Sequence, residues 1–429
     1  KKLYSIFLGI ILFCSFSHAE VFYVSTMGND SNDGKSWITA FAGVQKAIDA
    51  AAAVATDSEP AQVWIAKGTY SNAGGTYDSS TKVNTAYVMR NNVEIYGGFA
   101  GTETKLDERV SGNKTILTTT GNYVFYNNYT SSASLTNTAK LDSVTIIAAY
   151  SNGIYNYHAS PDITNCTISG NDDDGIFNRF SSPTISNCTI SANGGSGIYN
   201  NFSNTTSSSP TISNCTISEN KGHGIYNYAC TKAYSFISDP FIIPTITNCT
   251  ISGNGGSGIY NYSSNEAGRA DMISSIIPTI SNCRIFGNTG SGVYSKASAR
   301  GGYFPYSNYC SISIEISNCT IFENGDYGIY NATHSSYVSS FASLSSTITN
   351  CTISGNEGHG IYNSSTSAIS ADDISSLSST LTNCTISENE GVGIYNNNSS
   401  TSADSSSLTS TITNCIIWGN TSQQINNEA

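Results

Sequence analysis

An aromatic residue recurs at one position of a repeated block, and a column of aromatic rings could bind the faces of sugar rings. The block Gly-Ile-Tyr-Asn, or a close variant of it, occurs nine times. Its third residue is expected to point outward, and the nine residues are Tyr155, Phe177, Tyr199, Tyr226, Tyr260, Tyr294, Tyr330, Tyr362 and Tyr395. Outward aromatic residues on neighbouring strands also stack on each other without a ligand. The column therefore predicts either a glycan-binding surface, with the tyrosines from Tyr199 to Tyr395 as its binding residues, or a structural stack.

Carboxylates gather in the turn that precedes this block. Asp172, Asp173 and Asp174 form the one dense group, and single acids occupy similar turns elsewhere: Glu219, Glu323, Asp326, Glu357 and Glu388. Paired carboxylates could serve as general acid and base or bind Ca²⁺. Single acidic turn residues on a soluble rod need no such function. We keep Asp172, Asp173 and Asp174 as acidic candidates, assign no catalytic residue and expect no metal site.

A third column is rich in hydroxyl groups and could form a flat, regular surface. Its members are Thr184/Ser186, Thr211/Ser213, Thr245/Thr247, Thr279/Ser281, Thr347/Thr349, Thr380/Thr382 and Thr411/Thr413, and Glu315 interrupts it. Such an array resembles ice-binding surfaces. Threonine also suits any exposed strand. Ice binding is therefore kept only as an alternative.

The blocks that carry these columns belong to a longer repeat marked by cysteine. Its cysteines are Cys166, Cys188, Cys215, Cys249, Cys283, Cys319, Cys351, Cys384 and Cys415, spaced by 22 to 36 residues. From each of the first eight, the last residue of the aromatic block lies 12 residues on, whereas the distance from there to the next cysteine varies from 10 to 24. Self-similarity with insertions at one place is typical of a solenoid, in which one loop on one face absorbs the extra residues.

Each repeat predicts about three short strands separated by turns. Ile185, Cys188, Ile190 and Ile198 alternate with polar residues, which indicates half-buried strands of no more than about five residues. We expect the nine cysteines to form an inward column of free thiols, because each occupies an apolar slot. An asparagine precedes every cysteine and another follows it by five residues. Asparagine accepts a left-handed turn conformation, and stacked amides can bond from coil to coil.

The Asn-Cys-Thr-Ile-Ser and Gly-Ile-Tyr-Asn blocks, over roughly 150 to 420, resemble the right-handed parallel β-helix repeat family of the pectate-lyase-like superfamily. The resemblance implies an all-β, right-handed parallel β-helix solenoid, and we expect about 12 coils with an N-terminal capping helix. The superfamily includes lyases, hydrolases, adhesins and proteins without known activity. In its lyases and hydrolases the corresponding face bears Asp, Lys or Arg. The aromatic column of this chain has none, which argues against a lyase mechanism.

The N-terminal region differs from the repeats. Residues 1–19 read as a secretory signal peptide, because two lysines precede a short apolar run and Ser17-His18-Ala19. Residues 20–140 form the cap and irregular first coils. A helix is expected over Phe41 to Val54, because Val44, Ala47, Ile48 and Ala51 recur there at helical spacing. Residues 141–429 are the regular repeats of the same domain. This N-terminal region resembles that of secreted bacterial β-helix proteins, some of them called polymorphic outer-membrane proteins.

Charge and composition narrow the function. The net charge is −12, and charged residues make up 11% of the chain, so nucleic acid is not expected as a partner. We predict a secreted or cell-surface monomer, with no transmembrane segment in the mature chain. No cofactor is expected, and Ca²⁺ is kept as an alternative. The favoured function is a non-catalytic glycan-binding or adhesive rod that takes a polysaccharide or cell-surface glycan. The alternative is a polysaccharide lyase or glycoside hydrolase.

Overall fold

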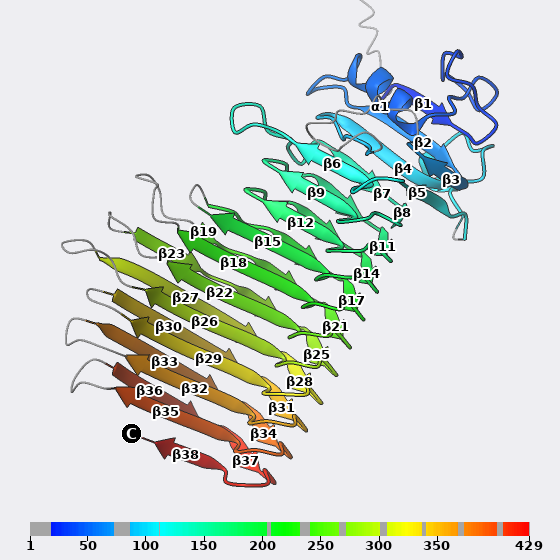
Figure 1. Cartoon of the computed structure of the whole chain (residues 1–429). Coiled ribbons are helices and arrows are strands. Elements are labelled where there is room, and N and C mark those ends of the chain that lie inside the picture. The colour runs from blue at the N-terminus through cyan, green and yellow to red at the C-terminus, as the bar shows by residue number, and fades with distance from the viewer. Residues whose placement is uncertain are drawn as a thin grey trace, which may run out of the picture.

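The protein is a parallel β-solenoid built from three long sheets, seen from the side in Figure 1. This computed structural model describes residues 19–72, 86–110, 112–203, 207–231, 241–265, 272–300, 307–336, 340–367, 373–400 and 406–428. The predicted signal peptide lies outside these residues apart from its last position. Among the described residues, no helix is long and apolar enough to cross a membrane.

The regular coils contribute strands to all three sheets, and neighbouring strands pair in parallel. The first sheet contains β1 (Val21–Val24), β2 (Ala61–Ala66), β4 (Val93–Phe99), β7 (Lys140–Asp142), β10 (Asp162–Thr164), β13 (Thr184–Ser186), β16 (Thr211–Ser213), β19 (Phe241–Ile242), β20 (Thr245–Thr247), β23 (Met272–Ile276), β24 (Thr279–Ser281), β27 (Asn308–Ser317), β30 (Ser340–Thr349), β33 (Ile374–Thr382) and β36 (Ser406–Thr413). The second contains β3 (Gly68–Ser71), β5 (Thr115–Thr118), β8 (Thr145–Ile147), β11 (Thr167–Ser169), β14 (Thr189–Ser191), β17 (Thr216–Ser218), β21 (Thr250–Ser252), β25 (Arg284–Phe286), β28 (Thr320–Phe322), β31 (Thr352–Ser354), β34 (Thr385–Ser387) and β37 (Ile416–Trp418). The third contains β6 (Phe125–Asn128), β9 (Ile154–Tyr157), β12 (Ile176–Arg179), β15 (Ile198–Ser203), β18 (Ile225–Thr231), β22 (Ile259–Asn265), β26 (Val293–Arg300), β29 (Ile329–Ser336), β32 (Ile361–Ser367), β35 (Ile394–Ser400) and β38 (Ile425–Glu428). The 12 described strands of the second sheet agree with the expected number of coils.

The apolar register predicted from the repeat is confirmed in the core. Ile185, Ile190 and Ile198 are fully buried, and Cys188 is 1% exposed. Eight of the nine repeat cysteines are buried, whereas Cys415 in the last coil is partly exposed. All are free thiols, as are the buried Cys230 and Cys310 of the variable segments. Each repeat thiol lies 3.1–3.3 Å from the carbonyl oxygen two residues before it, which satisfies the weak S–H donor.

The two asparagines of each repeat have separate structural roles. The asparagine before each cysteine turns the chain between the first and second sheets with φ between 52° and 55°. That left-handed conformation is tolerated by asparagine better than by most residues. The asparagine five residues after the cysteine is buried and forms a ladder. In this ladder Asn193 donates from Nδ2 to Oδ1 of Asn220 over 2.9 Å, and Asn220 does the same to Asn254 over 3.0 Å.

A second buried amide ladder follows the last residue of the aromatic block. Asn200 Nδ2 donates to Asn227 Oδ1 over 2.8 Å, and Asn227 donates to Asn261 over the same distance. Ser295 accepts from Asn261 over 3.2 Å, but the ladder is interrupted there, because Asn331 Oδ1 has no hydrogen-bond partner, and it resumes with Asn331 Nδ2 donating to Asn363 Oδ1 over 3.0 Å. The sequence identifies these residues as constant but not as hydrogen-bonded to each other. Two internal ladders therefore hold the coils in register, in addition to the backbone pairing.

The N-terminal end is closed by a short amphipathic helix, α1 (Val44–Ala52). Its buried residues are Val44, Ala47, Ile48 and Ala51, the four that the helical spacing predicts. The helix is shorter than the expected Phe41 to Val54. Asp30 explains the start, because its Oδ1 accepts from the backbone N–H groups of residues 42 and 43 just before the first turn. A 3₁₀ turn, η1 (Leu106–Glu108), follows β4.

The variable segments differ from the prediction of short strands joined by loops. In the C-terminal half, β27 and β30 each have ten residues, and the third-sheet strands opposite them are also long. Apolar and polar residues alternate from Ser311 to Ser317, as in a strand, and each of these residues pairs with a residue of β30. Small interior side chains let the two sheets lie close together, and Ser375 Oγ donates across to Thr333 Oγ1 over 2.7 Å. The inserted residues therefore lengthen strands of the first and third sheets, which makes both sheets wider.

Candidate functional site

The aromatic column lies on the outer face of the third sheet, with every member half-buried. Most consecutive rings stack nearly parallel: the centroids of Tyr199 and Tyr226 are 4.5 Å apart, and those of Tyr294 and Tyr330 are 4.4 Å apart. The pairs Phe177–Tyr199 and Tyr226–Tyr260 meet edge to face instead. The stacking expected of a structural column is confirmed. Because the rings cover each other's faces, the column offers its ring edges and hydroxyl groups to solvent.

Three tyrosine hydroxyls of the column hold their protons more tightly than a free phenol does. Burial raises the pKa of Tyr199 and of Tyr330 to about 12. At the end of the column, the hydrogen bond to Glu428 and burial raise the pKa of Tyr395 to about 12. A protonated phenol both donates and accepts a hydrogen bond. The column can therefore present an array of neutral donors and acceptors, which suits the hydroxyl groups of a sugar chain.

A second file of side chains borders this column in the turn that leads into the third sheet. His223 stacks on Tyr260 at 4.3 Å, and His359 stacks on Tyr395 at 4.8 Å. His223 Nδ1 accepts from the backbone N–H of Ser257 over 2.9 Å, and burial lowers its pKa to about 4. Neutral imidazoles held by backbone amides extend the aromatic surface. They lie in different coils and do not form a proton-transfer pair.

The three acidic candidates lie in two environments. Asp172 and Asp173 are exposed, whereas Asp174 is 6% exposed and occupies the file that borders the aromatic column. Asp174 Oδ1 accepts from the backbone N–H of Ser196 over 2.6 Å. Burial and the charge of Asp173 raise the pKa of Asp174 to about 7. The structure thus brings one carboxyl, with an unusual proton affinity, to the edge of the aromatic face.

No set of three or more His, Cys, Asp or Glu side chains that could hold a metal ion occurs within the described part of the chain. The single acids of the later turns are used structurally. Glu219, Glu323 and Glu388 have φ between 52° and 58°, at a position where other coils have glycine. They therefore mark turns, and their side chains do not gather at one place.

A second outward column on the same sheet was missed by the sequence reasoning. It lies two residues beyond the aromatic column, and its members include Tyr157, Arg179, Asn201, Tyr228, Tyr262 and Lys296. Tyr226 and Tyr228 have ring centroids 6.0 Å apart, so the two columns are in contact. The period-two alternation of a strand predicts this column once the aromatic one is placed. The sheet does carry basic residues, although the aromatic column itself does not.

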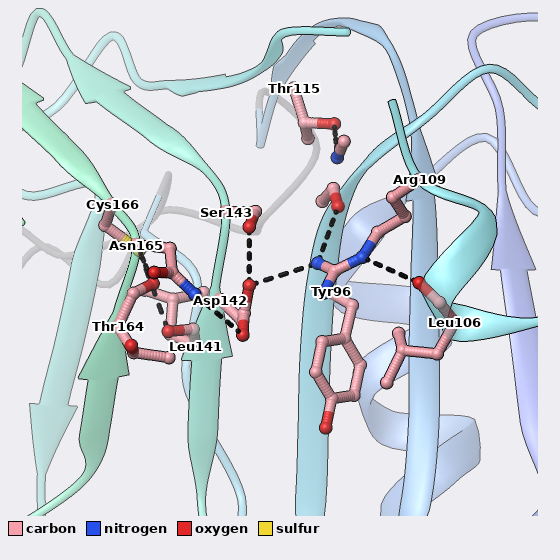
Figure 2. Close-up of polar contacts among 12 residues, drawn as sticks. Tyr96, Leu106, Arg109, Thr115, Leu141, Asp142, Ser143, Thr164, Asn165 and Cys166 are labelled. Atoms are coloured by element: carbon pink, nitrogen blue, oxygen red, sulfur yellow. Dashed lines mark hydrogen bonds and ion pairs between the residues drawn. The ribbon is translucent and has the colours of Figure 1, made fainter. Parts of the chain in front are cut away.

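A depression lies elsewhere, between the irregular coils and the first regular one. It has a volume of about 510 Å³ and includes Arg109, Ser143 and Asn165 in its lining. Figure 2 shows that Arg109 is already paired: its Nη1 lies 3.0 Å from Asp142 Oδ1 and 3.2 Å from the carbonyl oxygen of Gly97. Asn165 Nδ2 donates to Asp142 over 3.4 Å. These contacts join the N-terminal coils to the repeats.

The hydroxyl column lies on the outer face of the first sheet, as predicted. The widened strands add further rows to it: Ser313, Ser345, Ser378 and Thr409 align across β27, β30, β33 and β36. Glu315 aligns with Thr279 and Thr347 and interrupts one row. Ice binding by this face stays a prediction.

Comparison with known proteins identifies the fold. The sequence matches the family described as right handed beta helix region over residues 109–268 and 244–429. No curated protein matches the sequence significantly. The A-module of mannuronan C-5 epimerase AlgE4 from Azotobacter vinelandii superimposes with a TM-score of 0.52 at 16% identity, covering 90% of this chain and 94% of that one. Pectate lyase Pel9A superimposes with a TM-score of 0.34 at 13% identity, covering 90% of this chain and 78% of that one. PfbA, a surface adhesin of Streptococcus pneumoniae, superimposes with a TM-score of 0.24 at 12% identity, covering 89% of each chain.

Proposed function

Because this chain belongs to the family of proteins with a right-handed β-helix region, we propose that it is a secreted or cell-surface rod that binds glycans without modifying them. The observation that carries the proposal is the pair of adjacent outward columns on the third sheet. Together they give a surface of phenol rings, amides and a few cations several coils long. An elongated surface of neutral hydrogen-bonding groups beside aromatic rings suits an extended sugar chain.

The binding test uses a tyrosine in the middle of the column. Tyr260→Ala removes a ring that stacks on Tyr294 at 4.5 Å and on His223. Tyr309→Ala is the matched control, because Tyr309 also stacks on a neighbouring ring, Phe341 at 4.7 Å, but on the first sheet. On a glycan array, the first variant is expected to lose binding by about tenfold, since a buried aromatic contact contributes about 0.5–1.5 kcal/mol beyond its area. Equal binding by both variants, or silence of the wild-type protein, would refute the proposal.

A second function, cleavage of a polysaccharide, is favoured by one observation. A carboxyl with a pKa of about 7 could act as a general acid at neutral pH, and Asp174 borders the aromatic column. The A-module that superimposes with a TM-score of 0.52 belongs to a mannuronan C-5 epimerase, and at 16% identity this is a likeness of fold alone. This function predicts release of reducing or unsaturated sugars from a polysaccharide panel, tested with and without Ca²⁺, and its loss in Asp174→Asn. No release from any polymer would exclude it.

A further inference from the structure

Three basic side chains meet on the outer face of the third sheet, beside the aromatic column. Lys296 and Arg300 both lie on β26, four residues apart and so on one face, and His334 lies on the adjacent strand β29. The pairing of β26 with β29 places His334 next to Ser298, between the two β26 cations. With about 3.3 Å per residue along a strand and about 4.8 Å between strands, each cation is roughly 8 Å from His334 at the backbone. Their long side chains can reach a common point.

The cluster has no anionic partner among the described residues. The three ion pairs among the described residues involve Lys35, Arg90 and Arg109, and none of them includes a member of the cluster. Lys296 is nevertheless half-buried, and burial together with the nearby Arg300 charge lowers its pKa. Burial and the charges of Lys296 and Arg300 lower the pKa of His334. Lysine is seldom withdrawn from water without a partner, because an uncompensated charge is costly.

The setting of the cluster connects it with the aromatic surface. Lys296 aligns with Tyr262 on the preceding strand, and Tyr294 lies two residues before it on its own strand. The whole chain has only 18 Lys and Arg residues against 30 Asp and Glu. In a molecule of net charge −12, a half-buried lysine beside an exposed arginine of like charge is a local exception, because the two charges repel each other. An incoming anion would remove that repulsion.

We propose that Lys296, Arg300 and His334 form a binding site for an anionic group, a carboxylate or a sulfate ester, on a polysaccharide that lies along the aromatic column. This inference deepens the glycan-binding function proposed above and rests on it. Carboxylates and sulfates accept charge-assisted hydrogen bonds from arginine and lysine, and such bonds are about twice as strong as neutral ones. The site would therefore select acidic chains over neutral ones, although the overall charge of the protein opposes them.

The test compares polymers and charge variants of the full chain. Titration calorimetry is done with polygalacturonate, which carries carboxylates, with dextran sulfate, and with neutral dextran. The double variant Lys296→Gln/Arg300→Gln is compared with Lys46→Gln/Lys67→Gln, which removes two exposed lysines from the N-terminal coils. Loss of two charge-assisted bonds is expected to weaken binding of the acidic polymer by at least about tenfold. The control variant should keep wild-type affinity, and added salt should weaken binding.

Folding is not expected to obscure the result, because Lys296→Gln removes a half-buried charge that forms no ion pair with any described residue and should leave the melting temperature unchanged or raised. Binding of acidic polymers that is equal in both double variants, or binding of neutral dextran alone, would overturn the anion site while leaving the glycan-binding proposal in place. Binding that is lost with the two cations but unaffected by Tyr260→Ala would support the anion site and refute the role of the aromatic column. Absence of binding to all three polymers would overturn both.

Discussion

The buried asparagine ladder offers a quantitative test of how the coils are held together. Asn254 is fully buried, and its side chain makes four hydrogen bonds. Its Oδ1 accepts from Asn220 Nδ2 over 3.0 Å and from the Asn220 backbone N–H over 3.1 Å. Its Nδ2 donates to Asn288 Oδ1 over 2.9 Å and to the carbonyl oxygen of Ile217 over 3.2 Å. Asn254→Ala removes all four.

The free-energy cost follows from the partners that remain. Truncation leaves the Asn220 backbone N–H and one Nδ2–H of Asn220 without a partner, although Asn220 Nδ2 still donates to the Ile190 carbonyl oxygen over 3.2 Å. The Ile217 carbonyl stays within the paired β17–β21 ladder, and Asn288 Oδ1 still accepts from the Asn254 backbone N–H over 3.1 Å. At about 1–2 kcal/mol for each buried donor left without a partner, the expected loss is about 2–4 kcal/mol. Asn248→Ala in the same coil is the control. Its side chain is exposed and φ is 55°, so alanine there should cost only about 1–2 kcal/mol of left-handed strain.

The assay must report on the coil itself, because a long repeat array need not unfold in one step. Native-state hydrogen exchange of the amides in β21 and β22 gives the local free energy of opening in each variant. The reasoning predicts a clearly larger loss of protection in Asn254→Ala than in Asn248→Ala. Equal losses, both near 1 kcal/mol, would show that the ladder contributes little and that backbone pairing alone sets the register.

Further predictions concern the turns, the buried acid and the thiols. Glu323 has φ of 52°, so Glu323→Gly should stabilise the protein by about 0.5–1 kcal/mol in thermal unfolding, whereas Gly355→Ala, at φ of 62° in the equivalent turn, should destabilise it by about as much. The pKa of Asp174 is raised in the folded state from 3.8 to about 7, so the stability that its protonated carboxyl contributes is full below about pH 4, falls as the pH rises and is lost above about pH 7. Relative to Asp174→Asn, the wild-type protein should therefore lose up to about 4 kcal/mol of stability between pH 4 and pH 8, and parallel pH profiles would contradict this. Cys415 is only partly buried, so a thiol reagent should modify it well before Cys166 to Cys384, as mass spectrometry of the labelled peptides can show.

The core and the turns could be predicted from the sequence because the same constraint repeats in every coil. Ile190, Cys188 and the asparagine before it recur at constant spacing, and alternation alone assigns their direction. The helix α1 was predicted through the spacing of four residues that prove to be buried. Each of these features depends on local pattern, which one sequence contains.

The width of the sheets and the second outward column were missed for physical reasons. Whether Ser340–Thr349 forms a loop or a strand depends on the partner that the next coil supplies, and that pairing is not local. The basic cluster joins Lys296 and His334 from different coils, so no motif in the sequence spans it. The pKa of Asp174 likewise depends on its burial beside Ser196, 22 residues further on.

Stacking of equivalent side chains from coil to coil is the central claim, and removal of one whole coil tests it most directly. Excision of residues 250–283 joins Cys249 to Arg284 and brings Tyr226 onto Tyr294, with every column continuous. The shortened protein is expected to fold cooperatively, to keep its β-type circular dichroism and to retain glycan binding. Excision of residues 250–258, which removes only part of a coil, should abolish folding. Equal damage from both deletions would contradict the claim that register between coils, one repeat at a time, builds this molecule.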